Sequence, residues 1–239
     1  MSRLLATLIA CCLAVALASC GDDGGDETAA TPEPTAEATT EAPAANEFLP
    51  EGCEDVEAPA PKEEGTLEAP KEKLDQSKTY VATVSTTCGD FQITLDAKRA
   101  PITGGSFKYL ADEKFYDGLV FHRIISNFVI QGGDPTGSGN GGPGYSVEEP
   151  APSDLKYEKG IVAMAKTEAE PSGTSGSQFF VVTGDESSPA ATLPPDYALV
   201  GQVTDGMDVV EKIGTIQADQ NTGMPAAPVI IKSVTVEES

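Results

Sequence analysis

Short stretches of alternating apolar and polar residues recur along the chain from residue 80 onward. The stretches 80–86 and 91–95 are rich in β-forming residues and flank the turn sequence Cys88-Gly89-Asp90, which predicts a β-hairpin. Six further stretches of this kind are bounded by Gly, Pro, Asn or Asp, at 119–125, 128–131, 161–165, 178–183, 198–204 and 229–236. Eight short strands at close spacing predict a mainly β fold, a closed eight-stranded antiparallel barrel.

Two segments have apolar residues at helical spacing instead. The first begins at Pro101, which suits a first helical position, and places three apolar side chains on one face, Ile102, Phe107 and Leu110. The second places three more on one face, Met207, Val210 and Ile213. Asp205 is the expected N-cap of this second helix, and Gly214 is its expected end. We therefore expect two helices to cap the barrel.

The N-terminus has the three-part pattern of an export signal. Arg3 precedes a run of 14 apolar or small residues, 4–17, interrupted only by Thr7, and small residues lead to Cys20. A membrane-spanning helix needs about 20 apolar residues, so residues 1–19 are predicted to be a signal peptide. Leu17-Ala-Ser-Cys20 resembles the lipobox of bacterial lipoproteins. That resemblance implies acylation of Cys20 and a lipid anchor on the outer face of the bacterial cytoplasmic membrane. An ordinary cleaved signal that ends in Cys is the alternative.

Residues 20–79 have the composition of a tether. This stretch is dominated by Ala, Thr, Pro, Glu and Asp, and 21–79 carries 17 acidic and 4 basic side chains. Such a segment buries too little apolar surface to fold alone, and its charges repel one another. It is predicted to be a disordered acidic stalk before the folded domain at 80–239. The alternative is an acidic tail that recruits a partner.

Composition excludes several kinds of chemistry. The chain has 239 residues, with 15 Lys and Arg against 38 Asp and Glu, a formal net charge of -23. This charge argues against nucleic-acid partners. One imidazole, His122, leaves no room for a multi-His metal site, so we expect no metal and no cofactor and assign His122 a structural role. Gly137 to Gly142 matches G-x-G-x-x-G, but Pro143 follows and no helix opens, so we expect a mobile loop.

Three segments together resemble the signatures of a known family. They are Phe121-His-Arg-Ile-Ile, Phe128-Val-Ile-Gln-Gly-Gly-Asp and Gly176-Ser-Gln-Phe-Phe. Their sequence, order and spacing are similar to those of the cyclophilin family of peptidyl-prolyl cis-trans isomerases. The resemblance runs from about residue 80 to 236 and includes Met164-Ala165 and the segment 197–201. The family's fold, an eight-stranded barrel capped by two helices, agrees with the elements that the alternation predicts.

The resemblance implies an enzyme that isomerises X-Pro bonds. Together with the export signal, it leads us to expect an enzyme that assists the folding of exported proteins. Amide resonance opposes this rotation with a barrier of about 18 to 20 kcal/mol, and a catalyst must favour the twisted amide. The family match makes Arg123 the cation that hydrogen-bonds the proline nitrogen. It also implies the substrate-binding residues: an apolar cup of Phe128, Val129, Phe180 and Leu193, orienting groups Gln131 and Gln178, the backbone near Ala165, and Tyr197 at the pocket edge. The expected partners are proline-containing segments of exported or unfolded proteins, bound by a monomer.

The sequence differs from the family at three positions of the expected pocket, and two other functions compete with isomerisation. Thr192 stands where many members have Trp, Tyr197 where many have His, and Val129 where eukaryotic members often have Met. A proline-peptide binding module or holding chaperone with little turnover would use the same cup, yet it would not need Arg123. A lipoprotein that binds small molecules for a transporter would need a larger two-domain α/β chain.

Two cysteines are left once the signal is removed and Cys20 is acylated. They are Cys53 in the tether and Cys88 in the first hairpin turn. An exported chain meets an oxidising environment, where such a pair is more often bridged than free. We therefore predict a Cys53–Cys88 disulfide, which would order 53–79 against the barrel. Two unpaired thiols are the alternative.

Overall fold

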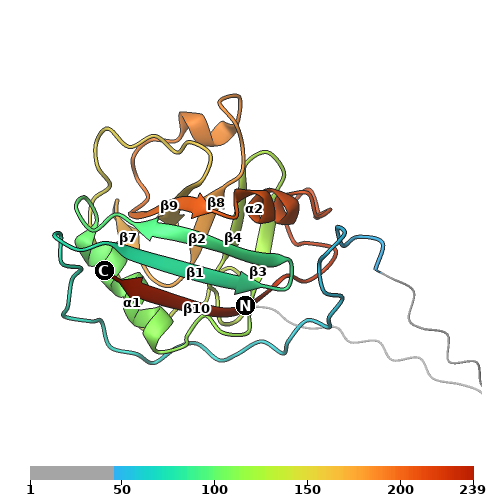
Figure 1. Cartoon of the computed structure of the whole chain (residues 1–239), viewed down its shortest axis with the longest axis horizontal. Helices are drawn as coiled ribbons and strands as arrows, with labels where there is room; N and C mark the ends of the chain where they lie inside the picture. The colour runs from blue at the N-terminus through green and yellow to red at the C-terminus, as the bar shows by residue number, and fades with distance from the viewer. Residues whose placement is uncertain (1–45) are drawn as a thin grey trace, which may run out of the picture. The chain divides into compact units, whose positions relative to one another are not determined.

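Eight antiparallel strands close into a barrel in the computed structural model, which describes residues 46–239. Around the barrel the strands follow the order β1-β10-β3-β4-β8-β6-β9-β2. Figure 1 shows β10, β1 and β2 side by side. Their bounds are Tyr80–Thr86 (β1), Gly89–Leu95 (β2), Leu119–Ile125 (β3), Val129–Gly132 (β4), Ile161–Met164 (β6), Phe179–Val182 (β8), Leu199–Asp205 (β9) and Ile230–Glu238 (β10). The predicted fold class, a closed eight-stranded antiparallel barrel with two helices, is confirmed.

The alternation in the sequence corresponds to the two faces of the barrel wall. In β1 every second residue is buried, and β2 turns Phe91, Ile93 and Leu95 inward. Aromatic rings fill the interior. Phe107 and Tyr116 each pack edge-on against Phe179, with ring centroids 5.6 Å apart, and they pack against each other in a tilted arrangement at 5.1 Å. The interior is therefore a packed core, and any binding site lies on the outer surface or the rim.

Helix α1 (Pro101–Asp112) packs against β10 and β9, with Pro101 in its first turn as predicted. Its buried face includes Phe107 and Leu110, whereas Ile102 is only half-buried. Gly104 and Gly105 complete that face, and a Cβ on Gly104 would lie 2.5 Å from Leu74 Cδ1. The helix thus leaves room for a segment that precedes the barrel.

Helix α2 (Met207–Gly214) packs against β2 and β4, and the predicted cap is wrong. Asp205 ends β9, and Gly206 is the N-cap, with φ +72° and no side-chain hydrogen bond. A Cβ at Gly206 would lie 2.5 Å from the carbonyl oxygen of Asp90. The tight turn from strand to helix therefore requires glycine, and an aspartate cap cannot take its place.

The sequence pattern did not predict three short elements. Strands β5 (Val147–Glu148) and β7 (Thr174–Ser175) pair in a separate two-stranded sheet, and a 3₁₀ helix, η1, covers Pro189–Thr192. Ser188 caps η1, its Oγ accepting from the N–H of Ala190 at 3.1 Å. Elements of two to four residues are too short to show a period, so they depend on the loops that surround them.

The segment from Glu54 to Leu74, here called the strap, lies along the outside of the barrel before β1 (Figure 1). It is held by backbone hydrogen bonds at both ends: Glu54 N–H donates to Thr87 O at 2.7 Å, and Leu74 N–H to Pro101 O at 3.0 Å. The Leu74 side chain is buried in the core. Upstream of the strap, Leu49 also packs against the core. The part of the predicted tether that the structure describes is therefore attached to the barrel along its length.

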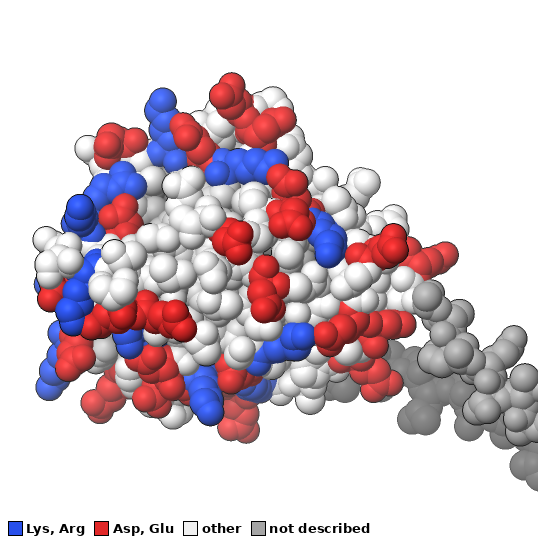
Figure 2. Space-filling view, viewed as in Figure 1, with Lys and Arg blue, Asp and Glu red and all other residues white. Residues whose placement is uncertain are grey.

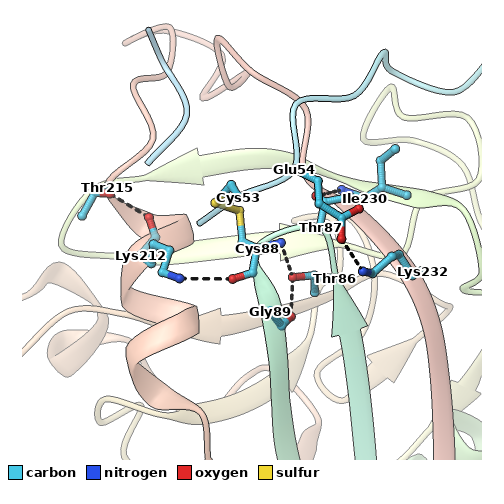
Figure 3. The surroundings of a disulfide bond; sticks show 10 residues. All are labelled: Cys53, Glu54, Thr86, Thr87, Cys88, Gly89, Lys212, Thr215, Ile230 and Lys232. Atoms are coloured by element: carbon cyan, nitrogen blue, oxygen red, sulfur yellow. Dashed lines mark hydrogen bonds and ion pairs between the residues drawn. A yellow bond between two sulfur atoms is a disulfide. The ribbon is translucent and has the colours of Figure 1, made fainter. Parts of the chain in front are cut away.

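A disulfide joins Cys53 to Cys88, as the cysteine count predicts (Figure 3). Cys88 is buried in the turn between β1 and β2, where its N–H donates to Thr86 Oγ1 at 3.0 Å. Lys212 from α2 donates to the carbonyl oxygen of Cys88 at 3.3 Å. The bridge therefore fastens the start of the strap to a turn that is itself held from two sides.

Several expectations concern residues outside the described part. The signal peptide at 1–19, the lipidation site Cys20 and the stalk as far as residue 45 all lie there. Within 46–239, no helix is long and apolar enough to cross a membrane. The same residues contain no group of three or more His, Cys, Asp and Glu side chains placed to hold a metal ion. On the face drawn in Figure 2, acidic and basic side chains are interspersed, and acidic ones predominate along its lower edge.

Candidate functional site

Arg123 is presented on the outside of the barrel by an irregularity in β3. The register between β3 and β4 shifts between Phe121 and Arg123, so His122 and Arg123 both point away from the core. Across the next two strands, Arg123 is paired with Gln131, and Gln131 is paired with Phe180. Three adjacent strands thus bring a cation, an amide and an aromatic ring side by side.

These side chains line a cavity of about 480 Å³ on the outer face of β3, β4 and β8. Its lining includes Arg123 and seven of the eight predicted substrate-binding residues, Phe128, Val129, Gln131, Ala165, Phe180, Leu193 and Tyr197. Gln178 lies in the wall of a neighbouring cavity instead. The wall also contains residues that the sequence did not single out, among them Lys166, Thr222 and Met224. The arrangement is an apolar pocket with a few convergent polar groups, which is typical of a small-ligand site.

A chain of hydrogen bonds fixes the polar side of the cavity. Arg123 Nη1 donates to Gln131 Oε1 at 3.2 Å, and Gln131 Nε2 donates to Gln178 Oε1 at 3.0 Å. Gln178 Nε2 in turn donates to the carbonyl oxygens of Gly139 and Gly141, at 3.0 and 2.9 Å. Gln178 therefore orients Gln131 without lining the same cavity, and the series connects Arg123 to the glycine-rich loop.

Arg123 is a cation without a carboxylate partner among the described residues. Burial of the side chain lowers the pKa of Arg123, but a guanidinium stays protonated at any physiological pH. Its charge is therefore available to a group that enters the cavity. Because the surroundings exclude part of the water, a hydrogen bond from this guanidinium is stronger than one in bulk solvent.

The apolar side of the cavity is built from rings in contact. Phe180 and Tyr197 lie edge to face with centroids 5.5 Å apart, and Tyr157 packs against both. Tyr157 was not predicted: its hydroxyl donates to the Tyr197 carbonyl at 2.8 Å and accepts from the Tyr197 N–H at 2.9 Å. Burial raises the pKa of Tyr157 to about 12, so it stays a neutral donor. A buried tyrosine in a loop gives no sequence signal of this positioning role.

The loop 219–224 supports Arg123 from behind. Gly223 has φ +75°, and a Cβ there would lie 2.8 Å from Arg123 Cγ. The Ile124 N–H donates to the Gly223 carbonyl at 2.8 Å, and the Asp219 carboxylate accepts from the Thr222 N–H at 2.8 Å. Beyond Gly223, the exposed side chain of Met224 reaches the rim of the cavity. The sequence pattern gave no sign of this contact, because it depends on how the barrel closes.

Two other residues discussed from the sequence have different positions. His122 lines the cavity, and burial lowers the pKa of its ring, so that it is neutral at pH 7. Thr192 ends η1, where its hydroxyl donates to the Pro189 carbonyl at 2.9 Å, and it is absent from the cavity lining. That edge of the cavity is formed by Leu193 and Tyr197 instead.

The glycine-rich loop after β4 is organised by Asp134. The Asp134 carboxylate accepts from the backbone N–H groups of Thr136 (2.7 Å), Gly139 (2.5 Å) and Gly141 (3.3 Å). Burial acts to raise the pKa of Asp134, but hydrogen bonds from the Thr136 hydroxyl and from these N–H groups lower it below its usual value. The G-x-G-x-x-G spacing thus belongs to a turn wrapped around a carboxylate, and the N–H groups of Gly139 and Gly141 already donate to that carboxylate.

Comparison with known proteins finds similar chains. The family model described as cyclophilin type peptidyl-prolyl cis-trans isomerase matches residues 81–236. Peptidyl-prolyl cis-trans isomerase A of Mycobacterium tuberculosis is 38% identical over 175 residues, covering 66% of this chain and 92% of that protein. A fission yeast (Schizosaccharomyces pombe) peptidyl-prolyl cis-trans isomerase is 39% identical over 158 residues, covering 64% of this chain and 97% of that protein.

A solved structure is also similar in fold. The cyclophilin type peptidyl-prolyl cis-trans isomerase of Cryptosporidium parvum aligns with a TM-score of 0.60 and 30% identity. The alignment covers 66% of this chain and 98% of that one. A second crystal structure of that protein, determined in the presence of the dipeptide Ala-Pro, aligns with a TM-score of 0.59. The strap and everything before it lie outside the family match.

Proposed function

This chain belongs to the cyclophilin-type peptidyl-prolyl cis-trans isomerase family, and we propose that Arg123 and the apolar cavity beside it carry out the isomerisation. The observation that supports this proposal most strongly is the half-buried Arg123 guanidinium next to Phe128 and Phe180, which has no carboxylate partner within 46–239. The crystal structure of the Cryptosporidium parvum relative determined with Ala-Pro agrees with a proline-containing ligand.

The proposed mechanism needs no covalent step. In a planar X-Pro amide the nitrogen lone pair is delocalised, and it becomes a hydrogen-bond acceptor only when the bond twists. Arg123 donates to that nitrogen, while the apolar cup holds the proline ring in place. Because this hydrogen bond exists only in the twisted state, it lowers the barrier rather than merely strengthening binding. Every 1.4 kcal/mol of such stabilisation increases the rate about tenfold.

The polar residues hold the substrate and the catalytic side chain in position. Gln131, itself fixed by Gln178, orients Arg123 through the 3.2 Å hydrogen bond. The Ala165 N–H already donates to the Gln178 carbonyl at 2.8 Å, so the Ala165 carbonyl is the group that accepts from a substrate N–H.

A holding chaperone is the rival function, and kinetics separate the two. A blocked Ala-Pro peptide is brought out of its cis–trans equilibrium, and its relaxation is followed with increasing amounts of the protein. The isomerase is expected to accelerate relaxation in proportion to its concentration, well below the peptide concentration, over an uncatalysed time of tens to hundreds of seconds. Binding of the peptide without acceleration would instead identify a holding module.

Gly223 offers a test of how Arg123 is positioned. Gly223→Ala introduces a Cβ that would lie 2.8 Å from Arg123 Cγ, and we expect kcat to fall about ten- to a hundredfold because the guanidinium is displaced. Gly118→Ala is the matched control, since Gly118 has a similar φ of +77° but no atom within 4 Å of its Cβ position. Both variants lose some stability through the left-handed backbone. Equal kcat values in the two variants would show that Gly223 does not position Arg123.

We also propose that the clients are exported proteins and that the enzyme is lipid-anchored outside the cytoplasmic membrane. Support comes from the sequence: an apolar run of 14 residues, 4–17, whose last residue begins the lipobox-like Leu17-Ala-Ser-Cys20. The acidic residues of the stalk would hold the barrel away from an anionic membrane surface. The Cys53–Cys88 disulfide agrees with an oxidising compartment.

Replacing Cys20 with Ser tests the anchor. Stable attachment needs two or more acyl chains on the N-terminal residue, and serine offers no thiol to receive the first. We expect Cys20→Ser protein in the soluble fraction of lysed cells and the unaltered protein in the membrane fraction. Cys12→Ser, which changes a thiol inside the predicted signal peptide, is the control and should leave the protein with the membranes. Membrane association of the Cys20→Ser variant would refute the lipid anchor.

A further inference from the structure

A second cavity of about 510 Å³ adjoins the proline cavity. The two cavities share four lining residues, Gln131, Gly139, Ala165 and Lys166. One wall of the second cavity is the loop 139–146, and the opposite wall contains Thr167 and Glu170. Glu64 of the strap completes the lining, and it is the one lining residue that precedes the family match.

The strap is seated closely at this point. The Gly65 N–H donates to the Gly142 carbonyl at 2.9 Å, and the Leu67 N–H donates to the Pro143 carbonyl at 2.9 Å. A Cβ on Gly65 would lie 2.5 Å from Pro143 O, and one on Gly144 would lie 2.6 Å from Gly65 O. The backbone of the strap contacts the backbone of the loop 142–144 directly. These contacts at Gly65 fix the position of the preceding residue, Glu64.

The charges around the second cavity are predominantly negative. Glu64 and Glu170 each contribute a carboxylate, and Glu170 is held by the N–H and hydroxyl of Thr167 at 2.6 and 2.8 Å. The one lysine, Lys166, is almost fully buried, and its ammonium pairs with the Asp196 carboxylate at 2.7 Å. A cationic side chain therefore meets attraction in this cavity, and an anionic side chain meets repulsion.

We propose that Glu64 is a specificity-determining residue that favours substrates with Lys or Arg two residues before the proline. The inference rests on the proposed function of the first cavity. The proline nitrogen faces Arg123 and is bonded to the preceding residue, so the preceding chain leaves on the Arg123–Gln131 side. Gln131 also borders the second cavity. Two extended residues span about 7 Å, enough to bring a side chain from one cavity into the other.

The test compares kcat/KM of the full chain on blocked peptides Xaa-Ala-Pro-Phe with Xaa as Lys, Gln or Glu. The unaltered protein is expected to prefer Lys over Glu. Glu64→Gln should reduce the Lys-to-Glu ratio of kcat/KM about two- to fivefold, the range of an ion pair with an exposed partner, and added salt should have a similar effect. Glu64→Lys should shift the preference toward Glu.

Glu63→Gln is the matched control. It removes the same charge from the neighbouring residue, which does not line the cavity, and should leave the ratio unchanged. If the unaltered, Glu63→Gln and Glu64→Gln proteins all turn over the peptides with the same Lys-to-Glu ratio of kcat/KM, this inference is overturned while the proposed function stands. Absence of turnover with every peptide would overturn the proposed function and this inference with it.

Discussion

Replacing Arg123 with Ala is expected to lower kcat/KM for X-Pro peptides about 100- to 1000-fold, the usual effect of removing one donor to a transition state. The guanidinium has no carboxylate partner in the described residues and is held by Gln131 at 3.2 Å, so little else changes when it is removed. The loss should appear in kcat, because the proline nitrogen accepts the hydrogen bond only in the twisted state. Peptide affinity, which depends on the apolar cup, should change little.

Arg99→Ala is the matched control for this variant. Arg99 pairs with Asp96, its Nε lying 2.6 Å from Oδ2, and it does not line the cavity, so its loss removes an equal charge elsewhere. We expect activity close to that of the unaltered protein. Arg123→Lys keeps the positive charge but replaces the planar guanidinium with an ammonium group, and it should retain part of the activity. Similar activity of the Arg123→Ala and Arg99→Ala proteins would contradict the role of Arg123.

Removing the disulfide is expected to have the largest effect on stability. Cys53 and Cys88 are 35 residues apart in sequence, and opening a loop of that length lowers the free energy of unfolding by about 3 to 4 kcal/mol. The chain has no Trp, so urea unfolding is best followed by far-ultraviolet circular dichroism. The double variant Cys53→Ala/Cys88→Ala should unfold at markedly lower urea than the oxidised protein.

Reducing agent supplies the control for the disulfide prediction. It should lower the stability of the unaltered protein and have no effect on the double variant. Thiol titration of the unaltered protein under denaturing, non-reducing conditions should find no free thiol from Cys53 or Cys88. Equal urea midpoints with and without the reducing agent would show that the bridge does not stabilise the fold.

The barrel was predictable because strand alternation is a local property. A strand with one face in the core must alternate, and β1 does so throughout, as does β2 from Phe91 onward. The cap of α2 was mispredicted for a tertiary reason: the close approach of Asp90 O to Gly206 decides which residue can stand there. A sequence pattern does not contain that distance.

The candidate site was predictable where it lies on adjacent strands. Arg123, Gln131 and Phe180 belong to sequence motifs that resemble those of a known family, and strand register brings them together. Gly223 and Tyr157 escaped prediction because they reach the site from loops distant in sequence. The cysteine pair predicts that the strap is ordered against the barrel, but not where it is seated. That place is set by backbone contacts at Gly65, which leave no trace in side-chain chemistry.

One measurement tests the central claim, that Arg123 acts on the twisted amide and the apolar cup holds the proline. Two-dimensional exchange NMR on a proline peptide at equilibrium reports cis–trans exchange, and titration shifts in the same samples report affinity. The unaltered protein, far below the peptide concentration, is expected to produce exchange cross-peaks, whereas Arg123→Ala should bind with similar affinity and produce almost none. Full exchange in the Arg123→Ala sample, or loss of binding in proportion to loss of exchange, would contradict the account.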